Sequence, residues 1–171
     1  MPANVEIKAR ARDVAALRNR LEQLGGGPAK LLQQVDTFFV TNRGRLKLRE
    51  SDSGPGQLIY YERPDQDGPK RSDYSIFEAR DPGSLKAVLT LALGIRGTVE
   101  KVRSLYMIGQ TRVHLDEVKG LGSFVELEVV LRTGQSDHEG RLIAEGLIWQ
   151  LGVARDDLLE SAYMDMLEQA G

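Results

Sequence analysis

Apolar and polar residues alternate along most of the chain, and the alternating stretches are separated by short runs rich in glycine, proline or asparagine. A period of two is typical of β-strands, because successive side chains of a strand point to opposite faces. Eight such stretches occur, at residues 4–12, 31–40, 44–50, 57–63, 70–79, 97–108, 111–118 and 124–132. Short turns between neighbours favour antiparallel pairing. The pattern therefore predicts an antiparallel sheet of eight strands.

Four other segments repeat their apolar residues at helical spacing. They cover residues 13–24, 81–93, 136–151 and about 155–169. The third begins with Ser136 and Glu139, which have the spacing of a capping box. One face of the second carries Leu85, Val88, Leu89 and Ala92. We expect these amphipathic helices to pack their apolar faces on the sheet.

The charged residues of the predicted strands share one parity, so one face of the sheet is charged and the other is apolar. The charged face carries Glu6, Lys8, Arg10, Arg45, Lys47, Arg49, Lys101, Arg103, Arg112, His114, Asp116, Glu126 and Glu128. Two arrangements fit: an open sheet with this face in water, or a barrel closed around a charged interior with the helices outside. The separation of positive and negative charges onto different strands favours the barrel, because residues 44–50 carry mainly bases on this face and residues 124–130 carry only acids.

Composition narrows the function classes. With 171 residues the chain is long enough for one domain. Its 23 basic and 25 acidic residues nearly cancel and the pI is about 5.8, which argues against broad nucleic-acid binding. No stretch approaches the roughly 18 apolar residues of a membrane span, and the first ten residues lack a basic and apolar leader. We expect a soluble, cytoplasmic protein with no membrane or nucleic-acid partner.

Candidate metal ligands are limited to oxygen and imidazole, because the chain contains no cysteine. Glu126 and Glu128 lie two positions apart on one strand face, about 6–7 Å from each other. At this distance two carboxylates can share one hard cation or serve two.

Four motifs occur in a characteristic order. They are Val5-Glu6-Ile7-Lys8, Arg45-Leu-Lys-Leu-Arg49, Lys101-Val-Arg103, and His114-Leu-Asp116-Glu-Val-Lys-Gly-Leu-Gly-Ser-Phe-Val-Glu126-Leu-Glu128. Together they resemble the motifs of the CYTH domain, or triphosphate tunnel metalloenzyme, superfamily, and the last is most similar to class IV adenylyl cyclases. The resemblance implies an α+β fold in which residues 1–171 form a single domain, an eight-stranded antiparallel β-barrel with helices packed outside.

The resemblance also assigns roles to residues. It implies that Mg²⁺ or Mn²⁺ is held by Glu6, Asp116, Glu126 and Glu128. It implies that a triphosphate is bound by Lys8, Arg10, Arg45, Lys47, Arg49, Arg63, Lys101, Arg103 and Arg112. Catalytic roles fall to Lys8 and Asp116. Arg10, Arg45 and Arg112 match the motifs less closely, so ordinary surface salt bridges are an equal alternative for them. For His114, a hydrogen-bonded structural role is favoured over metal binding.

Two positions depart from the family pattern. Asn4 stands where the family has the first glutamate of its opening motif, which removes one negative charge from the metal site. Arg63 stands near the point on the fourth strand where many members have a lysine.

The implied substrates are triphosphate-bearing small molecules: ATP, inorganic triphosphate or thiamine triphosphate. Two reactions fit the same residues, the conversion of ATP to cyclic AMP and pyrophosphate, and hydrolysis at a terminal phosphorus. Because of Asn4, a non-catalytic module that binds polyphosphate or nucleotides remains the alternative function. The oligomeric state is left open, and a homodimer is one possibility. No adenine pocket is identifiable; Phe38, Phe39, Tyr60 and Tyr61 could stack on a base, but strand aromatics more often pack in the core.

Overall fold

The computed structural model describes residues 1–66 and 68–171. Its strands are β1 (Ala3–Arg10), β2 (Lys30–Phe39), β3 (Arg45–Ser51), β4 (Gly56–Glu62), β5 (Lys70–Ala79), β6 (Ile95–Ile108), β7 (Thr111–Val118), β8 (Gly122–Val130) and the two-residue β9 (Leu158–Leu159). Its helices are α1 (Val14–Gln23), α2 (Pro82–Leu93), α3 (Asp137–Gln150) and α4 (Tyr163–Ala170), and Arg155–Asp157 form a short 3₁₀ turn. The first eight strands are the predicted ones, with ends shifted by at most two residues.

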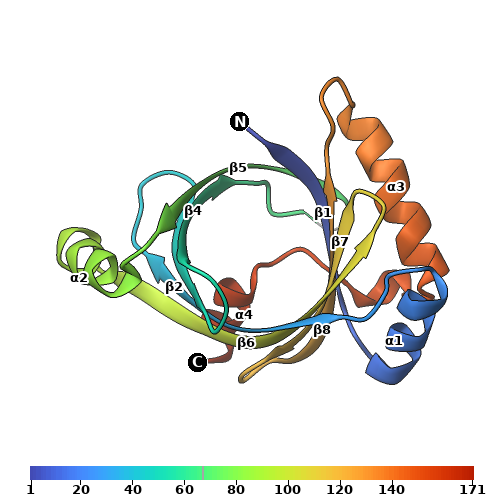
Figure 1. Ribbon diagram of the computed structural model, residues 1–171, viewed down its shortest axis with the longest axis horizontal. Coiled ribbons are helices and arrows are strands. Elements are labelled where there is room, and N and C mark those ends of the chain that lie inside the picture. The colour runs from blue at the N-terminus through green and yellow to red at the C-terminus, as the bar shows by residue number, and fades with distance from the viewer. Residues whose placement is uncertain (67) are drawn as a thin grey trace.

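Strands β1 to β8 form a closed antiparallel barrel (Figure 1). The strands follow the order β5-β4-β3-β2-β6-β7-β8-β1, and β5 also pairs with β1, from Ala3 opposite Asp73 to Glu6 opposite Lys70. This last pairing closes the sheet on itself. The predicted barrel is confirmed, and the open sheet with a solvated charged face is wrong.

The apolar parity of the strands faces outward and is covered by helices beside β1, β7 and β8 (Figure 1). Ile7 of β1 packs with Leu21 of α1 and Ala144 of α3 in one cluster of buried side chains. Helix α3 comes very close to the barrel at Gly140, where an added Cβ would lie 2.7 Å from a Val5 methyl group. Because this face is occupied, the alternate side chains of β1 must point into the barrel.

Helix α2 departs from the prediction that its apolar face is buried. Leu85 and Leu89 pack against the outside of the barrel, in the cluster around Leu48, but Ala92 is exposed and Val88 is 62% exposed. The buried contacts of the helix are made by Leu85 and Leu89, which pack with side chains of β2 to β5. This contact covers two of the four apolar residues, so the predicted apolar face is buried only in part.

The predicted helix over 155–169 is wrong in its first half. Strand β5 begins at Lys70, opposite Glu6, and so leaves the edge of β1 unpaired beyond that point. Residues 158–159 pair with that edge as β9, and the helix starts only at Tyr163. Unpaired strand edges are strong binding sites for extended chain, and this one overrides the local helical pattern. None of the helices in the described part of the chain is long and apolar enough to cross a membrane.

Candidate functional site

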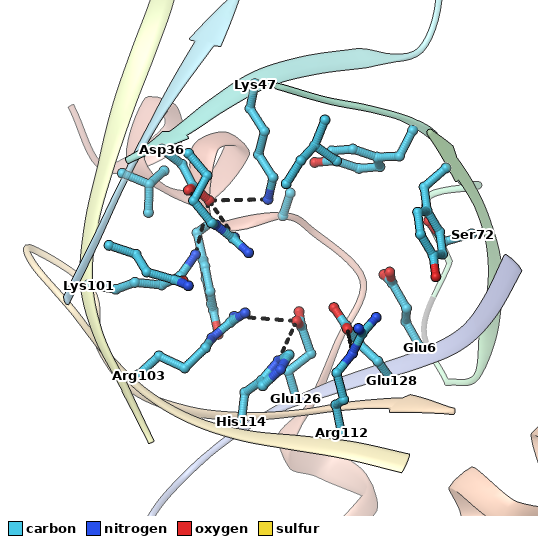
Figure 2. Close-up of a pocket in the computed structure, with 18 of the residues that line it drawn as sticks. Glu6, Asp36, Lys47, Ser72, Lys101, Arg103, Arg112, His114, Glu126 and Glu128 are labelled. Atoms are coloured by element: carbon cyan, nitrogen blue, oxygen red, sulfur yellow. Dashed lines mark hydrogen bonds and ion pairs between the residues drawn. The ribbon is translucent and has the colours of Figure 1, made fainter. Parts of the chain in front are cut away.

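The interior of the barrel is a cavity lined by charged side chains (Figure 2). It brings together ten of the residues singled out from the sequence: Glu6, Lys8, Lys47, Arg49, Arg63, Lys101, Arg103, Arg112, Glu126 and Glu128. These residues come from β1, β3, β6, β7 and β8 and from the segment that follows β4. They share the cavity because each lies on the inward parity of its strand or next to its end.

Three predicted site residues do not line this cavity. Arg10 is exposed at the end of β1, with its guanidinium carbon 5.6 Å from the centre of the Phe124 ring. Arg45 forms ion pairs with Asp65 and Asp165, the latter in α4. Asp116 is buried behind the cavity wall. Their predicted roles in substrate or metal binding remain predictions.

One wall of the cavity is basic and is organised by an acid that the sequence analysis did not single out. Asp36 of β2 is 1% exposed and accepts two hydrogen bonds from Arg49, both 2.8 Å long. The ammonium groups of Lys47 and Lys101 each lie 3.1 Å from the same carboxylate. Asp36 lies on the inward face of β2, as Phe38 does. This parity was the only sequence signal for its role, because the partners of Asp36 lie on other strands.

The opposite wall is acidic. Glu6 pairs with Arg63 at 2.9 Å, and Glu128 pairs with Arg112 at 3.0 Å. Glu126 lies 3.5 Å from Lys8. Figure 2 shows these acids on the side of the barrel facing Asp36 and Lys101. Arg63 thus takes part in the site, although it stands near the position where the family usually has a lysine.

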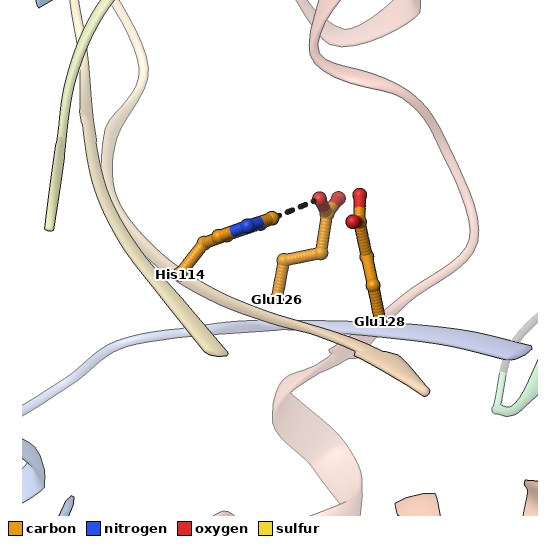
Figure 3. A group of neighbouring side chains, drawn as sticks. All are labelled: His114, Glu126 and Glu128. Atoms are coloured by element: carbon orange, nitrogen blue, oxygen red, sulfur yellow. Dashed lines mark hydrogen bonds and ion pairs between the residues drawn. The ribbon is translucent and has the colours of Figure 1, made fainter. Parts of the chain in front are cut away.

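A cluster on the acidic wall has the composition of a metal site (Figure 3). One ligand atom each of His114, Glu126 and Glu128 lies within 4.8 Å of the others. His114 is buried and its Nδ1 is 3.3 Å from a Glu126 carboxylate oxygen, as the structural role predicted for it requires. Asn4 also lines the cavity, and its Oδ1 is buried without a hydrogen-bond partner among the described residues. Carboxylate and amide oxygens suit hard divalent cations.

The surrounding cations stabilise the charged forms of Glu126 and Glu128 but not that of Glu6. Against the cost of burial, the charge of Lys8 holds the pKa of Glu126 well below its usual range. Burial raises the pKa of Glu6 against the opposing effect of Arg63, and the charges of Glu126 and Glu128 raise it further. A cation bound at this wall would relieve that repulsion.

Asp116 is fully engaged by protein groups. Both of its oxygens accept hydrogen bonds from Arg103, each 2.7 Å long, and one also accepts a 2.7 Å bond from the Tyr163 hydroxyl. Against burial, Arg103 lowers the pKa of Asp116 to about 2. The carboxylate therefore stays ionised and fixes both Arg103 and the start of α4.

Helix α4 lies at one end of the barrel, beside Arg45 at the start of β3 and Arg96 at the start of β6. Lys8 is held there by the Ser161 carbonyl at 3.4 Å and by the face of Tyr163, 4.0 Å from its ring centre. Tyr163 and Ala162 themselves line the cavity. Sequence reasoning missed this segment because it expected a continuous helix.

The other end of the cavity carries several uncharged side chains. Strands β1, β2, β4 and β7 run in one direction, since each is an even number of antiparallel steps from the others. Cavity residues at their starts therefore lie at the same end: Asn4, Leu32, Gln34, Gln57 and Arg112. Gln34 Oε1 is also buried without a partner among residues 1–66 and 68–171. Each of Leu32, Gln34 and Gln57 lies opposite a base on the neighbouring strand, so uncharged and charged side chains alternate at this end of the cavity.

Comparisons with known proteins agree with this architecture. The sequence model of the CYTH domain matches residues 2–163. A solved structure from Pyrococcus horikoshii OT3 is 23% identical, with a TM-score of 0.83, and the match covers 95% of this chain and 98% of that one. A candidate adenylate cyclase from Vibrio parahaemolyticus is 21% identical, with a TM-score of 0.80, covering 96% and 97% of the two chains.

A third structure is a candidate adenylyl cyclase from Hippeastrum that is described as having a dominant triphosphatase activity. It is 18% identical to this chain, with a TM-score of 0.66, and the match covers 97% and 95% of the two chains. At these identities the likeness shows a shared fold. Comparison with curated proteins gives no match. On its match to the family model, which extends over nearly the whole chain, the chain belongs to the CYTH domain family.

Proposed function

We propose that the protein is a metal-dependent enzyme that binds a triphosphate inside the barrel and cleaves one of its phosphoanhydride bonds. The observation that carries this proposal is the pair of opposed walls in the interior of one barrel, bases around Asp36 and acids around Glu126. A triphosphate has about four negative charges near neutral pH, and burying it without compensation would be prohibitive. The basic wall supplies part of that compensation.

The acidic wall supplies the rest indirectly. We assign a divalent cation, Mg²⁺ or Mn²⁺, to Glu126 and Glu128, which cluster with His114, and to Glu6, whose charge interacts with both glutamates. When bound, such an ion neutralises charge on the phosphoryl group that is transferred. Both oxygens of Asp116 are taken by Arg103 and Tyr163, so we assign Asp116 to positioning rather than to the metal.

Lys8 is the candidate proton acceptor. It lies between the acidic wall and α4, and burial lowers its pKa from the ordinary value despite the opposing charge of Glu126. A lowered pKa brings an amine nearer to the range in which it can take a proton from an attacking hydroxyl or water.

The uncharged side chains at the end of the cavity away from α4 favour an organic triphosphate over the inorganic one. Leu32 and the side-chain amides of Gln34 and Gln57 offer apolar contact and hydrogen bonds but no charge. A nucleoside has matching apolar faces and polar edges, whereas a terminal phosphate does not. Among the candidate substrates this favours ATP, with the Hippeastrum relative as a precedent for hydrolysis of a triphosphate.

The second candidate is a binding module without turnover, and Asn4 is the observation that favours it. A neutral amide at this position lowers the charge available to a cation, and metal affinity follows ligand charge. Such a module would bind ATP or polyphosphate equally well in EDTA.

One experiment separates these outcomes. Purified protein is incubated with Mg²⁺ or Mn²⁺ and with ATP, inorganic triphosphate or thiamine triphosphate, and cyclic AMP, pyrophosphate and orthophosphate are resolved. Cyclic AMP with pyrophosphate would identify a cyclase, and orthophosphate would identify a triphosphatase. Binding without product would support the binding module, and a protein that binds none of the three would overturn both proposals.

A further inference from the structure

Asp36 is the centre of a cluster of three cations. Its Oδ2 lies 2.8 Å from Arg49 Nη2 and 3.1 Å from each of the Lys47 and Lys101 ammonium nitrogens. Its Oδ1 accepts a second hydrogen bond from Arg49. The carboxylate comes from β2 and the cations from β3 and β6, the two strands that flank β2 in the barrel. No other acid of the described residues lies within 4 Å of the Lys47 or Lys101 nitrogen.

We propose that Asp36 is a positioning residue that holds Lys47, Arg49 and Lys101 as a preset grip for one phosphoryl group of the substrate. The inference rests on the proposed binding of a triphosphate in the barrel. It gives a reason for an acid in the basic wall, where the binding of a polyanion would by itself require only bases.

The geometry leaves the cations able to bind a second anion. Three nitrogens that share one oxygen cannot lie more than about 6 Å apart, which is close enough for a single phosphoryl group to contact all of them. Each lysine has N–H groups that Asp36 does not use, and Arg49 keeps its outer edge free of Asp36. All three side chains line the cavity, so these remaining donors have access to it.

Asp36 also keeps Lys101 charged. Burial lowers the pKa of Lys101 to about 7, with Asp36 opposing the fall and Arg103, Arg49 and Lys47 adding to it. The groups that face Lys101 from the surrounding elements are Asp36, Lys47, Arg49, Arg103, Asp116 and the ring of Tyr163. Without the Asp36 charge, a larger fraction of Lys101 would be neutral near physiological pH and would no longer attract phosphate.

A purely structural acid would behave differently. If Asp36 only balanced buried charge for folding, its removal would lower stability and leave anion binding unchanged or stronger, because a negative group would be gone from the cavity. A positioning acid predicts the opposite sign for binding, together with a change in its pH dependence.

The test measures binding of inorganic tripolyphosphate in EDTA by calorimetry, from pH 6 to pH 9, for the wild type and Asp36→Asn. The ionisation of the ligand is common to both proteins. If the substitution lowers the pKa of Lys101 by about one unit from about 7, affinity should fall about tenfold at pH 8 and about twofold at pH 6. The control is Asp157→Asn, which removes a buried acid paired with Arg12 outside the cavity. Its profile should follow the wild type.

Asp36→Glu is a second variant. It keeps the negative charge, so the fold should be retained. Its longer side chain moves the shared oxygen, so affinity should fall several-fold while the pH profile keeps its shape. Two results would overturn this inference and leave the proposed function intact. One is binding by Asp36→Glu within twofold of the wild type, and the other is a pH profile of Asp36→Asn parallel to that of the wild type. A wild type that binds tripolyphosphate with Mg²⁺ but not in EDTA would also overturn this inference alone, and one that binds it in neither condition would overturn the proposed function with it.

Discussion

The hydroxyl of Tyr163 ties the C-terminal helix to the interior of the barrel, and its removal tests that connection. Tyr163→Phe deletes the 2.7 Å hydrogen bond to Asp116, whose side chain is 1% exposed. The ring stays, with its contacts to Phe124 and the Lys8 ammonium. A hydrogen bond to a charged partner contributes about 1.5–3 kcal/mol, so the free energy of unfolding should fall by about 2 kcal/mol. For a chain of this length the Tm should fall by about 4–8 °C.

Chemical denaturation measures this loss, with Tyr106→Phe as the matched control. Tyr106 is also buried, but its hydroxyl meets Arg18 at 3.3 Å and that partner is only half-buried. The control should lose about 1 kcal/mol or less. If Tyr163→Phe is within about 0.5 kcal/mol of the wild type, the contact does not hold α4 on the barrel and the reasoning is refuted.

Three further predictions concern the cavity. Replacing Glu126 and Glu128 together by glutamine should reduce Mg²⁺-dependent turnover at least about 100-fold, to the level of the wild type in EDTA, with the fold retained by circular dichroism; activity that persists would place the metal elsewhere. Asn4→Glu should tighten Mn²⁺ binding several-fold in calorimetry because it restores a carboxylate at a buried cavity position, whereas Asn19→Glu on the exposed face of α1 should not. Burial lowers the pKa of Lys70 from 10.5 to about 8, so between these pH values the unfolded chain binds one more proton than the folded chain. The free energy of unfolding of the wild type, relative to that of Lys70→Met, should therefore rise with pH over this range. A difference that does not change with pH would contradict the shift.

Much of this protein is determined by local sequence. The period-two pattern fixes each strand and the parity of its side chains, because the alternation of a strand is a property of its own backbone. That is why ten of the predicted site residues share one cavity. The sorting of bases to β3 and acids to β8 is also visible along the chain, and it was sufficient to favour a closed barrel over an open sheet.

The partners of those residues were decided only by the tertiary structure. Glu6 and Arg63 are 57 positions apart, and Asp36 and Lys101 are 65 apart, so no local pattern could pair them. Asp36 was overlooked because one acid on a mainly neutral strand has no meaning until its three cations are placed around it. The predicted roles of individual residues in metal binding and catalysis remain predictions.

The C-terminal region shows the same limit most clearly. Residues 155–169 have a helical pattern, but Leu158 and Leu159 form a strand because β5 begins only at Lys70 and leaves the edge of β1 open beyond Glu6. Helix α2 shows the reverse case, a true helix whose apolar face the barrel covers only in part. Local periodicity determines which residues share a face. Only the closed barrel decides what that face meets, because packing and pairing join segments that are distant in the sequence.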